Sequence, residues 1–209
     1  MNQESEYPSA APRGRGRPRG STTGSTRRKI LKAATEEFST VGFEAASIRS
    51  VARRAGVDSA LVHHYFKDKT GLFLEALNMP VNPGELVAQA MTSPLDELGE
   101  ALVRTVVTAW ANPAIRPAAT SLIRGMLSSQ SATKLMRPFL QKELLARLGK
   151  SLPPADADRR AALAATQVIG MIIGRYIIQL EPLASMEDEE VVACIGPAVQ
   201  WHLTGKMPS

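Results

Sequence analysis

The sequence has few of the residues on which most metal and catalytic sites depend. It contains one cysteine, Cys194, and three histidines, at positions 63, 64 and 202, in 209 residues. A single cysteine excludes an intramolecular disulfide and fits a reducing compartment. No cysteine lies near the histidine pair, and the third histidine is far along the chain, so the spacing of a common metal site is missing. We therefore expect no metal site, no catalytic residue and no cofactor.

Long apolar runs are also missing. The longest, residues 168–180, has 13 residues and is interrupted by Arg175, whereas a membrane-spanning helix needs about 20. The chain does not open with a charged segment followed by an apolar one, as a secretory signal would. We therefore expect a cytoplasmic protein that does not span a membrane.

Positive charge is present, and it is confined to one end. The net charge of +5 belongs to residues 1–78, which hold 13 Lys and Arg against 8 Asp and Glu; residues 79–209 hold 12 of each. Residues 12–32 contain eight basic residues and no acidic one. This distribution predicts a polyanionic partner bound through the N-terminal end. A solvated tail that only keeps the protein soluble is the alternative.

The N-terminal end changes character near residue 26. Residues 1–25 are rich in Gly, Pro, Ser, Thr and Arg, and we expect them to form a disordered basic arm because they offer little apolar surface to bury. From Thr26 onward, apolar residues recur at helical spacing. Gly42 follows the last of them, where a left-handed cap would end the helix.

Two short helices are predicted next, separated by three residues. Ser47 is a good N-cap for the first, in which positions 48, 51, 52 and 55 form one apolar stripe that ends at Gly56. Asp58 is an N-cap for the second, which we expect to run over residues 59–66. A short turn that contains glycine between two short amphipathic helices is typical of the helix-turn-helix motif.

The histidine pair lies on the second of these helices. Adjacent helical residues point about 100° apart, so His63 and His64 cannot easily hold one metal ion, which favours i, i+4 spacing. Val62 and Phe66 form the natural core-facing pair, and Ser59 and His63 then share an outward face. We expect His63 to face DNA and His64 to lie near the DNA backbone, with an ordinary exposed or capping role for His64 as the alternative.

Residues 27–74 resemble the DNA-binding domain of the tetracycline-repressor (TetR) family of transcriptional regulators. The match is carried by the string RRKILKAATEEFSTVGFEAASIRSVARRAGVDSALVHHYFKDKTGLFLEAL. The resemblance implies an all-α fold, with a three-helix helix-turn-helix domain over residues 26–74. It further implies a C-terminal helical domain, over residues 75–209, that binds an effector and dimerises.

The resemblance also implies which residues contact double-stranded DNA. Ser47 would donate to a phosphate, Arg49 is a further phosphate candidate, and Lys69 would contact the DNA backbone from the entry to the fourth helix. Tyr65 is a phosphate donor or a core residue. Together with the opening of the recognition helix, the predicted set is Ser47, Arg49, Ser59, Ala60, His63, His64, Tyr65 and Lys69.

The string RGRGRPRG, residues 13–20, precedes the domain and resembles an AT-hook. Gly and Pro keep such a chain extended and narrow enough for the minor groove, and A·T-rich grooves attract the flanking arginines. We expect Arg15, Arg17 and Arg19 to bind there. A non-specific basic tail is the alternative.

Further helices are predicted in the C-terminal part. They cover residues 95–110, opened by Ser93, then 114–129, 132–148 with a kink at Pro138, 156–180 and 187–203. The last two are too apolar for surface helices of a monomer, and in the family they form a bundle between subunits. Gly170 and Gly174 would allow close helix approach, with a fully intramolecular core as the alternative.

The middle helices are expected to enclose a small-molecule pocket. Its candidate residues, for each of which an ordinary core role is the alternative, are Trp110, Arg124, Met126, Met136, Phe139, Met171 and Arg175. By resemblance, the protein is a homodimeric repressor of a palindromic operator that an effector releases. The alternatives are an activator, or an architectural protein that binds A·T-rich DNA without an effector. An enzyme that uses the histidines would lack a second catalytic group.

Overall fold

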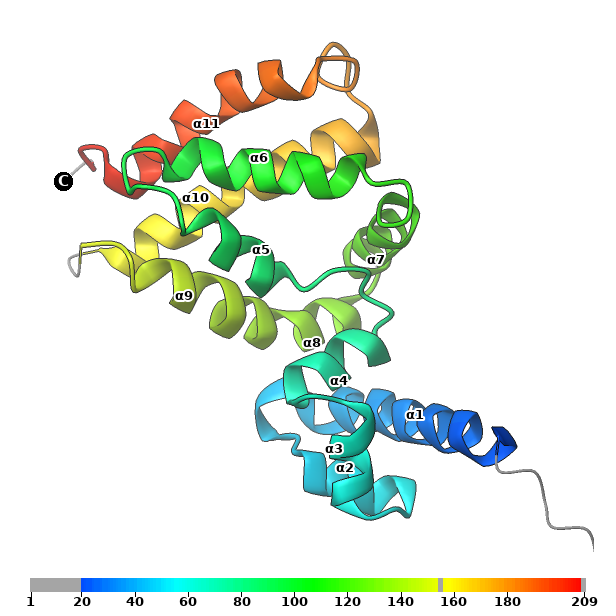
Figure 1. Cartoon of the computed structure of the whole chain (residues 1–209). Helices are drawn as coiled ribbons and strands as arrows, with labels where there is room; N and C mark the ends of the chain where they lie inside the picture. Colours follow the sequence, from blue (N-terminus) through cyan, green and yellow to red (C-terminus); the bar gives the residue numbers. More distant parts are fainter. Residues whose placement is uncertain (1–19, 154–155, 208–209) are drawn as a thin grey trace, which may run out of the picture.

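The computed structural model describes residues 20–153 and 156–207, and every regular element there is a helix (Figure 1). The all-α prediction is therefore confirmed. The elements are α1 (Gly20–Ala45), α2 (Ile48–Ala55), α3 (Ser59–Tyr65), α4 (Lys69–Ala76), α5 (Pro83–Ala90), α6 (Leu98–Ala111), α7 (Arg116–Ser128), α8 (Gln130–Leu140), η1 (Gln141–Leu145), α9 (Ala146–Gly149), α10 (Ala157–Ile172), η2 (Ile173–Ile178) and α11 (Asp188–Thr204).

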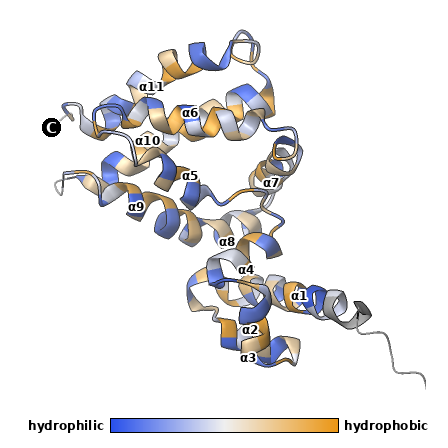
Figure 2. Ribbon diagram, viewed as in Figure 1, coloured by the Kyte–Doolittle hydropathy of each residue, from blue (hydrophilic) through white to orange (hydrophobic). Residues whose placement is uncertain are grey.

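The helices pack around two apolar clusters. The first combines α1 to α4 with two side chains of α8, Met136 and Phe139. The second combines α5, α6 and α9 to α11. Hydrophobic residues occur along both groups of helices (Figure 2). In Figure 1, α2 and α3 lie at one end of the molecule and α6, α10 and α11 at the other.

The first helix starts earlier than its apolar pattern. α1 begins at Gly20, inside the segment expected to be an arm, whereas its first fully buried side chain is Ile30. The helix is broken at Gly42, which has φ 81° and ψ 169°. A residue with a side chain adopts a positive φ only at a cost, which explains a glycine where the predicted helix ends.

The segment after α4 contains a helix that the sequence analysis missed. The Asn82 side chain accepts a hydrogen bond from the Gly84 amide at 3.0 Å, and Pro83 is the first residue of α5. An asparagine cap followed by proline is a common start of a helix, so the sequence contains a signal for α5.

The helix expected after Ser93 begins later than predicted. Residues 93–97 form a turn, in which the Glu97 amide donates to the Pro94 carbonyl oxygen at 3.1 Å, and α6 begins at Leu98.

The helix expected around Pro138 is continuous but irregular. α8, η1 and α9 follow one another without a loop, and η1 has the wider π-helical hydrogen-bond pattern. Proline cannot donate a backbone hydrogen bond, and such local widening is a known way for a helix to absorb the loss.

The tightest helix crossing joins α6 to α11. A Cβ atom on Gly99 would lie 2.5 Å from the Gln200 amide nitrogen and 2.6 Å from the Gly196 carbonyl oxygen. The Gly99 amide also donates to the Gln200 side chain at 2.7 Å. Of the two glycines expected to allow close approach, Gly170 has open space and Gly174 contacts Leu183 in the same chain. The close glycine contact within the chain is therefore at Gly99, and the expected approach of Gly170 and Gly174 between subunits stays a prediction.

The helix that spans α10 and η2 is longer than the apolar run found in the sequence. Residues 157–178 are long and apolar enough to cross a membrane by length and composition alone, and 22% of the most apolar window is buried. Near its end, Arg175 is 8% exposed and donates to the Leu183 and Met186 carbonyl oxygens and to Asp188. Most apolar side chains of this helix are partly buried, and Ile169 and Ile178 are exposed.

Candidate DNA-binding site and effector pocket

The N-terminus of α2 is fixed by a reciprocal pair of serines. The Ser47 hydroxyl oxygen accepts from the Ser50 amide, and the Ser50 hydroxyl oxygen accepts from the Ser47 amide, each at 3.0 Å. Ser47 is the predicted N-cap and is exposed. Because the Ser47 hydroxyl is used only as an acceptor, its proton is available to a phosphate oxygen.

The turn between α2 and α3 is tight and follows the predicted boundaries. Gly56 has φ 60° and ψ 44°, and its amide donates to the Arg53 carbonyl oxygen at 3.1 Å. The Val57 amide reaches back to the Ala52 carbonyl oxygen at 3.0 Å, and its side chain packs against the first cluster. The Asp58 carboxylate then caps α3 by accepting from the Ala60 amide at 2.7 Å.

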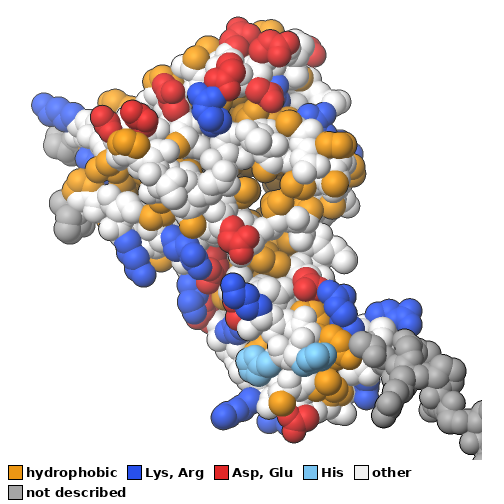
Figure 3. Space-filling view, viewed as in Figure 1, with side chains coloured by type: hydrophobic (Ala, Val, Ile, Leu, Met, Phe, Trp, Pro, Cys, Tyr) orange, Lys and Arg blue, Asp and Glu red, His pale blue; other side chains and the backbone are white. Residues whose placement is uncertain are grey.

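The orientation of α3 follows from its buried residues. Val62 and Phe66 are 0% and 2% exposed, which confirms the predicted core-facing pair. His63 and His64 are exposed on the other side, and Figure 3 shows histidine side chains at the surface of this end of the molecule. Within residues 20–153 and 156–207, no group of His, Cys, Asp and Glu is arranged to hold a metal ion.

The other residues predicted on α2 and α3 lie at or near this surface. Ala60 and Arg49 are exposed and Ser59 is partly buried. Tyr65 is half-buried and packs both against the first cluster and against the His64 ring, with ring centroids 5.2 Å apart. Arg15, Arg17 and Arg19 lie outside the described residues.

Lys69, at the start of α4, is held more firmly than the sequence indicated. Its ammonium donates to the Glu44 carbonyl oxygen at 3.0 Å and lies 4.6 Å from the centre of the Phe43 ring. Burial lowers the pKa of Lys69, the nearby ammonium of Lys142 lowers it further, and Glu44 opposes both. Two of the three ammonium protons remain for other acceptors.

One contact that the sequence analysis missed ties α1 to the recognition helix. The Arg27 guanidinium forms an ion pair with Glu75 of α4 and lies 5.3 Å from the centre of the Phe66 ring, at the end of α3. Glu75 and Arg27 are 48 residues apart in sequence, so no local spacing signals their pairing.

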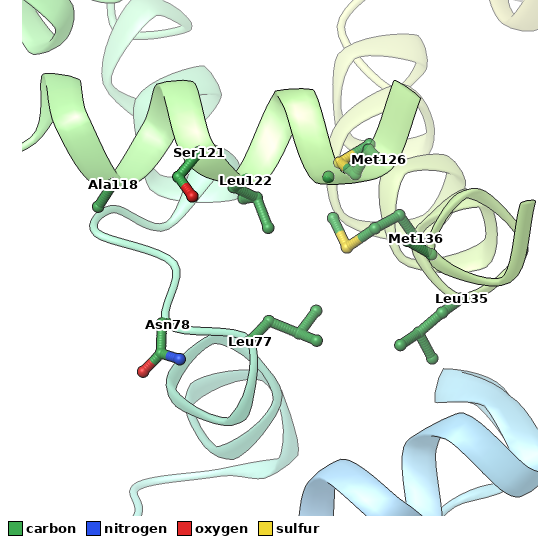
Figure 4. Close-up of a pocket in the computed structure, with 10 residues that line it drawn as sticks. Leu77, Asn78, Ala118, Ser121, Leu122, Met126, Leu135 and Met136 are labelled. Carbon is green, nitrogen blue, oxygen red and sulfur yellow. The ribbon is translucent and has the colours of Figure 1, made fainter. Parts of the chain in front are cut away.

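A pocket of about 440 Å³ lies between the end of α4, α7 and α8 (Figure 4). Ser121 and Asn78 lie on one side of it, and apolar side chains fill the other. No charged residue lines it. The lining residues are Leu77, Asn78, Ala118, Ser121, Leu122, Gly125, Met126, Ala132, Leu135 and Met136.

Only two of the seven predicted pocket residues, Met126 and Met136, line this cavity. Phe139 is buried among Phe43 and Phe73, with ring centroids 5.3 Å and 4.9 Å away. The other four are also placed elsewhere: Trp110 stacks on Tyr176, Met171 is buried in the second cluster, Arg124 is exposed, and Arg175 is bonded within the chain.

Comparison with known proteins covers both parts of the chain. The family described as "Bacterial regulatory proteins, tetR family" matches residues 30–76, and "Tetracyclin repressor-like, C-terminal domain" matches residues 96–203. The curated regulator BetI from Escherichia coli is 48% identical over 50 residues. That match covers 24% of this chain and only 25% of BetI.

Solved structures of similar proteins include other regulators. A TetR-family regulator from Streptomyces coelicolor A3 is 34% identical, and the match covers 91% of this chain and 99% of that one, with a TM-score of 0.45. The repressor NalD from Pseudomonas aeruginosa is 21% identical over 88% of this chain and 98% of its own, with a TM-score of 0.43. The C-terminal family match alone spans residues 96–203, more than half of the sequence. The chain therefore belongs to the tetracycline-repressor family and is a DNA-binding transcription regulator, not an enzyme.

Proposed function

We propose that this chain is a homodimeric repressor that binds an inverted-repeat operator and is released by a small, neutral, largely apolar molecule. The observation that carries the proposal is the pocket beside the end of α4. Its lining includes Leu77 and Asn78, the two residues that follow α4 directly. A ligand there would contact the element that leads back to α3, the proposed recognition helix.

The uncovered face of α10 and α11 supports the proposed dimer. Along α11, five exposed residues recur at helical spacing without a charge among them: Ala193, Cys194, Pro197, Ala198 and Trp201. Ile169 and Ile178 on the preceding helix are 48% and 66% exposed. Apolar side chains gathered over two neighbouring helices favour burial against a partner.

A dimer would place two copies of α3 on one face of the DNA. Two recognition helices about one DNA turn apart, roughly 34 Å, read an inverted repeat. In this arrangement residues 26–74 serve as the DNA-binding domain and residues 75–209 as the effector and dimerisation domain. The exposed His63 and Ala60 would face the base edges, while Ser47 and Lys69 would contact phosphates.

The chemistry of the pocket indicates the class of effector. A buried carboxylate or ammonium without a partner is strongly disfavoured, and no charged side chain lines the cavity. Ser121 and Asn78 offer hydrogen bonds at one side, and the leucine and methionine side chains offer adaptable apolar contact. The part of the effector that enters the pocket is therefore neutral and apolar, and its polar end would lie at the exposed side, near Ser121 and Asn78.

Filling the pocket tests this assignment. Ala132 lines the cavity, whereas its neighbour Ser131 is exposed on the same helix and does not. With the neutral dye Nile red as the probe, Ala132→Phe should weaken dye binding about tenfold or more, and Ser131→Phe should leave it unchanged. Decanol should displace the dye better than decanoate. Equal effects of the two substitutions would show that the dye does not bind in this pocket.

Residues 13–20 add a second DNA contact to the proposal. Their arginines suit an A·T-rich minor groove, and α1, which begins at Gly20, extends about 15 Å before its first fully buried residue, Ile30. Removing residues 1–19 should weaken DNA binding and make log K fall less steeply with log salt concentration. An unchanged slope would show that this segment does not bind DNA.

A further inference from the structure

A second lysine approaches the last turn of α1, just before α2, and it comes from the C-terminal part of the chain. Lys142 of η1 has its ammonium 3.6 Å from a carboxylate oxygen of Glu44 and 6.0 Å from the centre of the Phe43 ring. Lys69 lies over the same ring and donates to the carbonyl oxygen of the same Glu44. Two ammonium groups thus contact one residue, Lys142 at the Glu44 carboxylate and Lys69 at the Glu44 backbone carbonyl oxygen.

This cluster has more positive charge than its own residues neutralise. Lys142 makes no hydrogen bond within the described residues, and its ion pair with Glu44 is exposed, with both side chains 56% accessible. An exposed pair of this kind contributes little to stability. The two ammonium groups also disfavour each other, since Lys142 lowers the pKa of Lys69. A nearby anion would neutralise the excess positive charge and reduce the repulsion between the two ammonium groups.

The position of Lys142 is fixed by the residues around it. Phe139, three residues earlier, is 0% exposed, and its ring packs against Phe43 at 5.3 Å. The backbone of η1 is therefore anchored to the residue next to Glu44. Ser47, the exposed cap of α2, follows Glu44 by three residues, a span of at most about 10 Å. Glu44, the residue that both lysines contact, therefore lies within about 10 Å of the proposed phosphate-binding end of α2.

We infer that Lys142 is a further contact to the DNA backbone, forming with Lys69 and Ser47 a site for one phosphate group of duplex DNA. The inference rests on the proposed orientation of the DNA-binding face. Lysine binds phosphate as a compact charge with three donors, and among residues 20–153 and 156–207 no acceptor takes a hydrogen bond from Lys142. The C-terminal part of the chain thereby contributes directly to DNA affinity.

The test is a salt titration of DNA binding, with the full-length dimer and a mixed-sequence duplex. Each lysine–phosphate contact contributes about 0.9 to the slope of log K against log salt concentration. Because Lys69 still contacts the same phosphate, Lys142→Ala should flatten the slope by up to about 0.9 per protomer and weaken binding several-fold at low salt. Lys150→Ala removes the same charge from an exposed lysine eight residues further along and should leave the slope unchanged.

Glu44→Gln separates a phosphate contact from a structural ion pair. If Lys142 binds phosphate, removing the Glu44 charge frees its ammonium and should strengthen DNA binding, the opposite of Lys142→Ala. If the pair only supports the fold, both substitutions should weaken binding together. Thermal unfolding of both variants should match the unsubstituted protein, because the pair is exposed.

Lys69→Ala in the same titration tests the proposed orientation of the DNA-binding face separately from the role of Lys142. A flatter slope for Lys69→Ala with an unchanged slope for Lys142→Ala would overturn this inference and leave the proposed DNA-binding face intact. Unchanged slopes for both would overturn the orientation of that face as well. A flatter slope for Lys142→Ala together with tighter binding by Glu44→Gln supports the inference.

Discussion

At the residue scale, the sequence best predicts contacts between a residue and the backbone a few positions away. Ser47, Gly56 and Asp58 occupy the cap positions assigned to them, because capping depends on neighbours two or three residues away. The contacts of Lys69 were not predictable in this way. Its ammonium is held by Glu44, 25 residues earlier, and no local pattern encodes that distance.

Glu37 provides a test of electrostatics at this scale. It is 7% exposed, and Arg54 donates to its carboxylate at 2.7 Å, which lowers the pKa of Glu37. A folded-state pKa below the unfolded value stabilises the protein above the unfolded pKa of about 4.3, and this stability is lost as the pH falls through the folded pKa.

Glu37→Gln should therefore lower the free energy of unfolding by about 1 kcal/mol at neutral pH. The difference from the unsubstituted protein should shrink when the pH falls below about 4. Denaturant unfolding of both proteins at several pH values measures this. A difference that stays constant with pH would mean that the charge of Glu37 is not involved.

At the element scale, helix identity was more predictable than helix contact. Periodicity located the cores of α1, α2, α3 and α10, because each buries one face. The crossing of α6 and α11 depends on Gly99 meeting Gly196, which no periodicity reveals. The pocket was missed for the same reason: Leu77 and Asn78 come from one part of the chain and Ser121 from another.

The glycine crossing can be tested with a matched pair. At Gly99 an added methyl group would meet the backbone of α11 at 2.5 Å, whereas at Gly125 it would meet nothing within 4 Å. Gly99→Ala should lower the free energy of unfolding by about 1–3 kcal/mol, since the obstacle is backbone. Gly125→Ala should leave it unchanged or raise it by up to about 1 kcal/mol. Equal stabilities would show that α6 and α11 are not in close contact.

At the scale of the whole molecule, the uncovered apolar face is the feature that a single chain does not explain. Trp201 is 47% exposed within the stripe on α11, and Leu127 is 63% exposed on α7, away from it. A charge placed in a dimer interface is costly because it loses its water. If α11 forms the dimer interface, a charged substitution in the stripe should therefore disrupt the dimer, and one on α7 should not.

Trp201→Asp should convert the dimer to a monomer in sedimentation equilibrium and weaken operator binding at least tenfold, because the two recognition helices would no longer be joined. Leu127→Asp, the matched control on α7, should leave the dimer intact. If both variants are monomers, or if both remain dimers, the stripe on α11 is not the dimer interface.

Sequence selection from random DNA decides whether the protein is a dimeric, sequence-specific regulator. The full-length protein is mixed with a library of random duplexes at near-physiological salt, and the bound duplexes are sequenced. A homodimer with two copies of α3 should select an inverted repeat whose half-sites are spaced for two recognition helices, with A·T-rich flanks if residues 13–20 bind the minor groove. A bound pool without a repeat, or enriched only in A·T pairs, would contradict this prediction and favour an architectural DNA-binding protein.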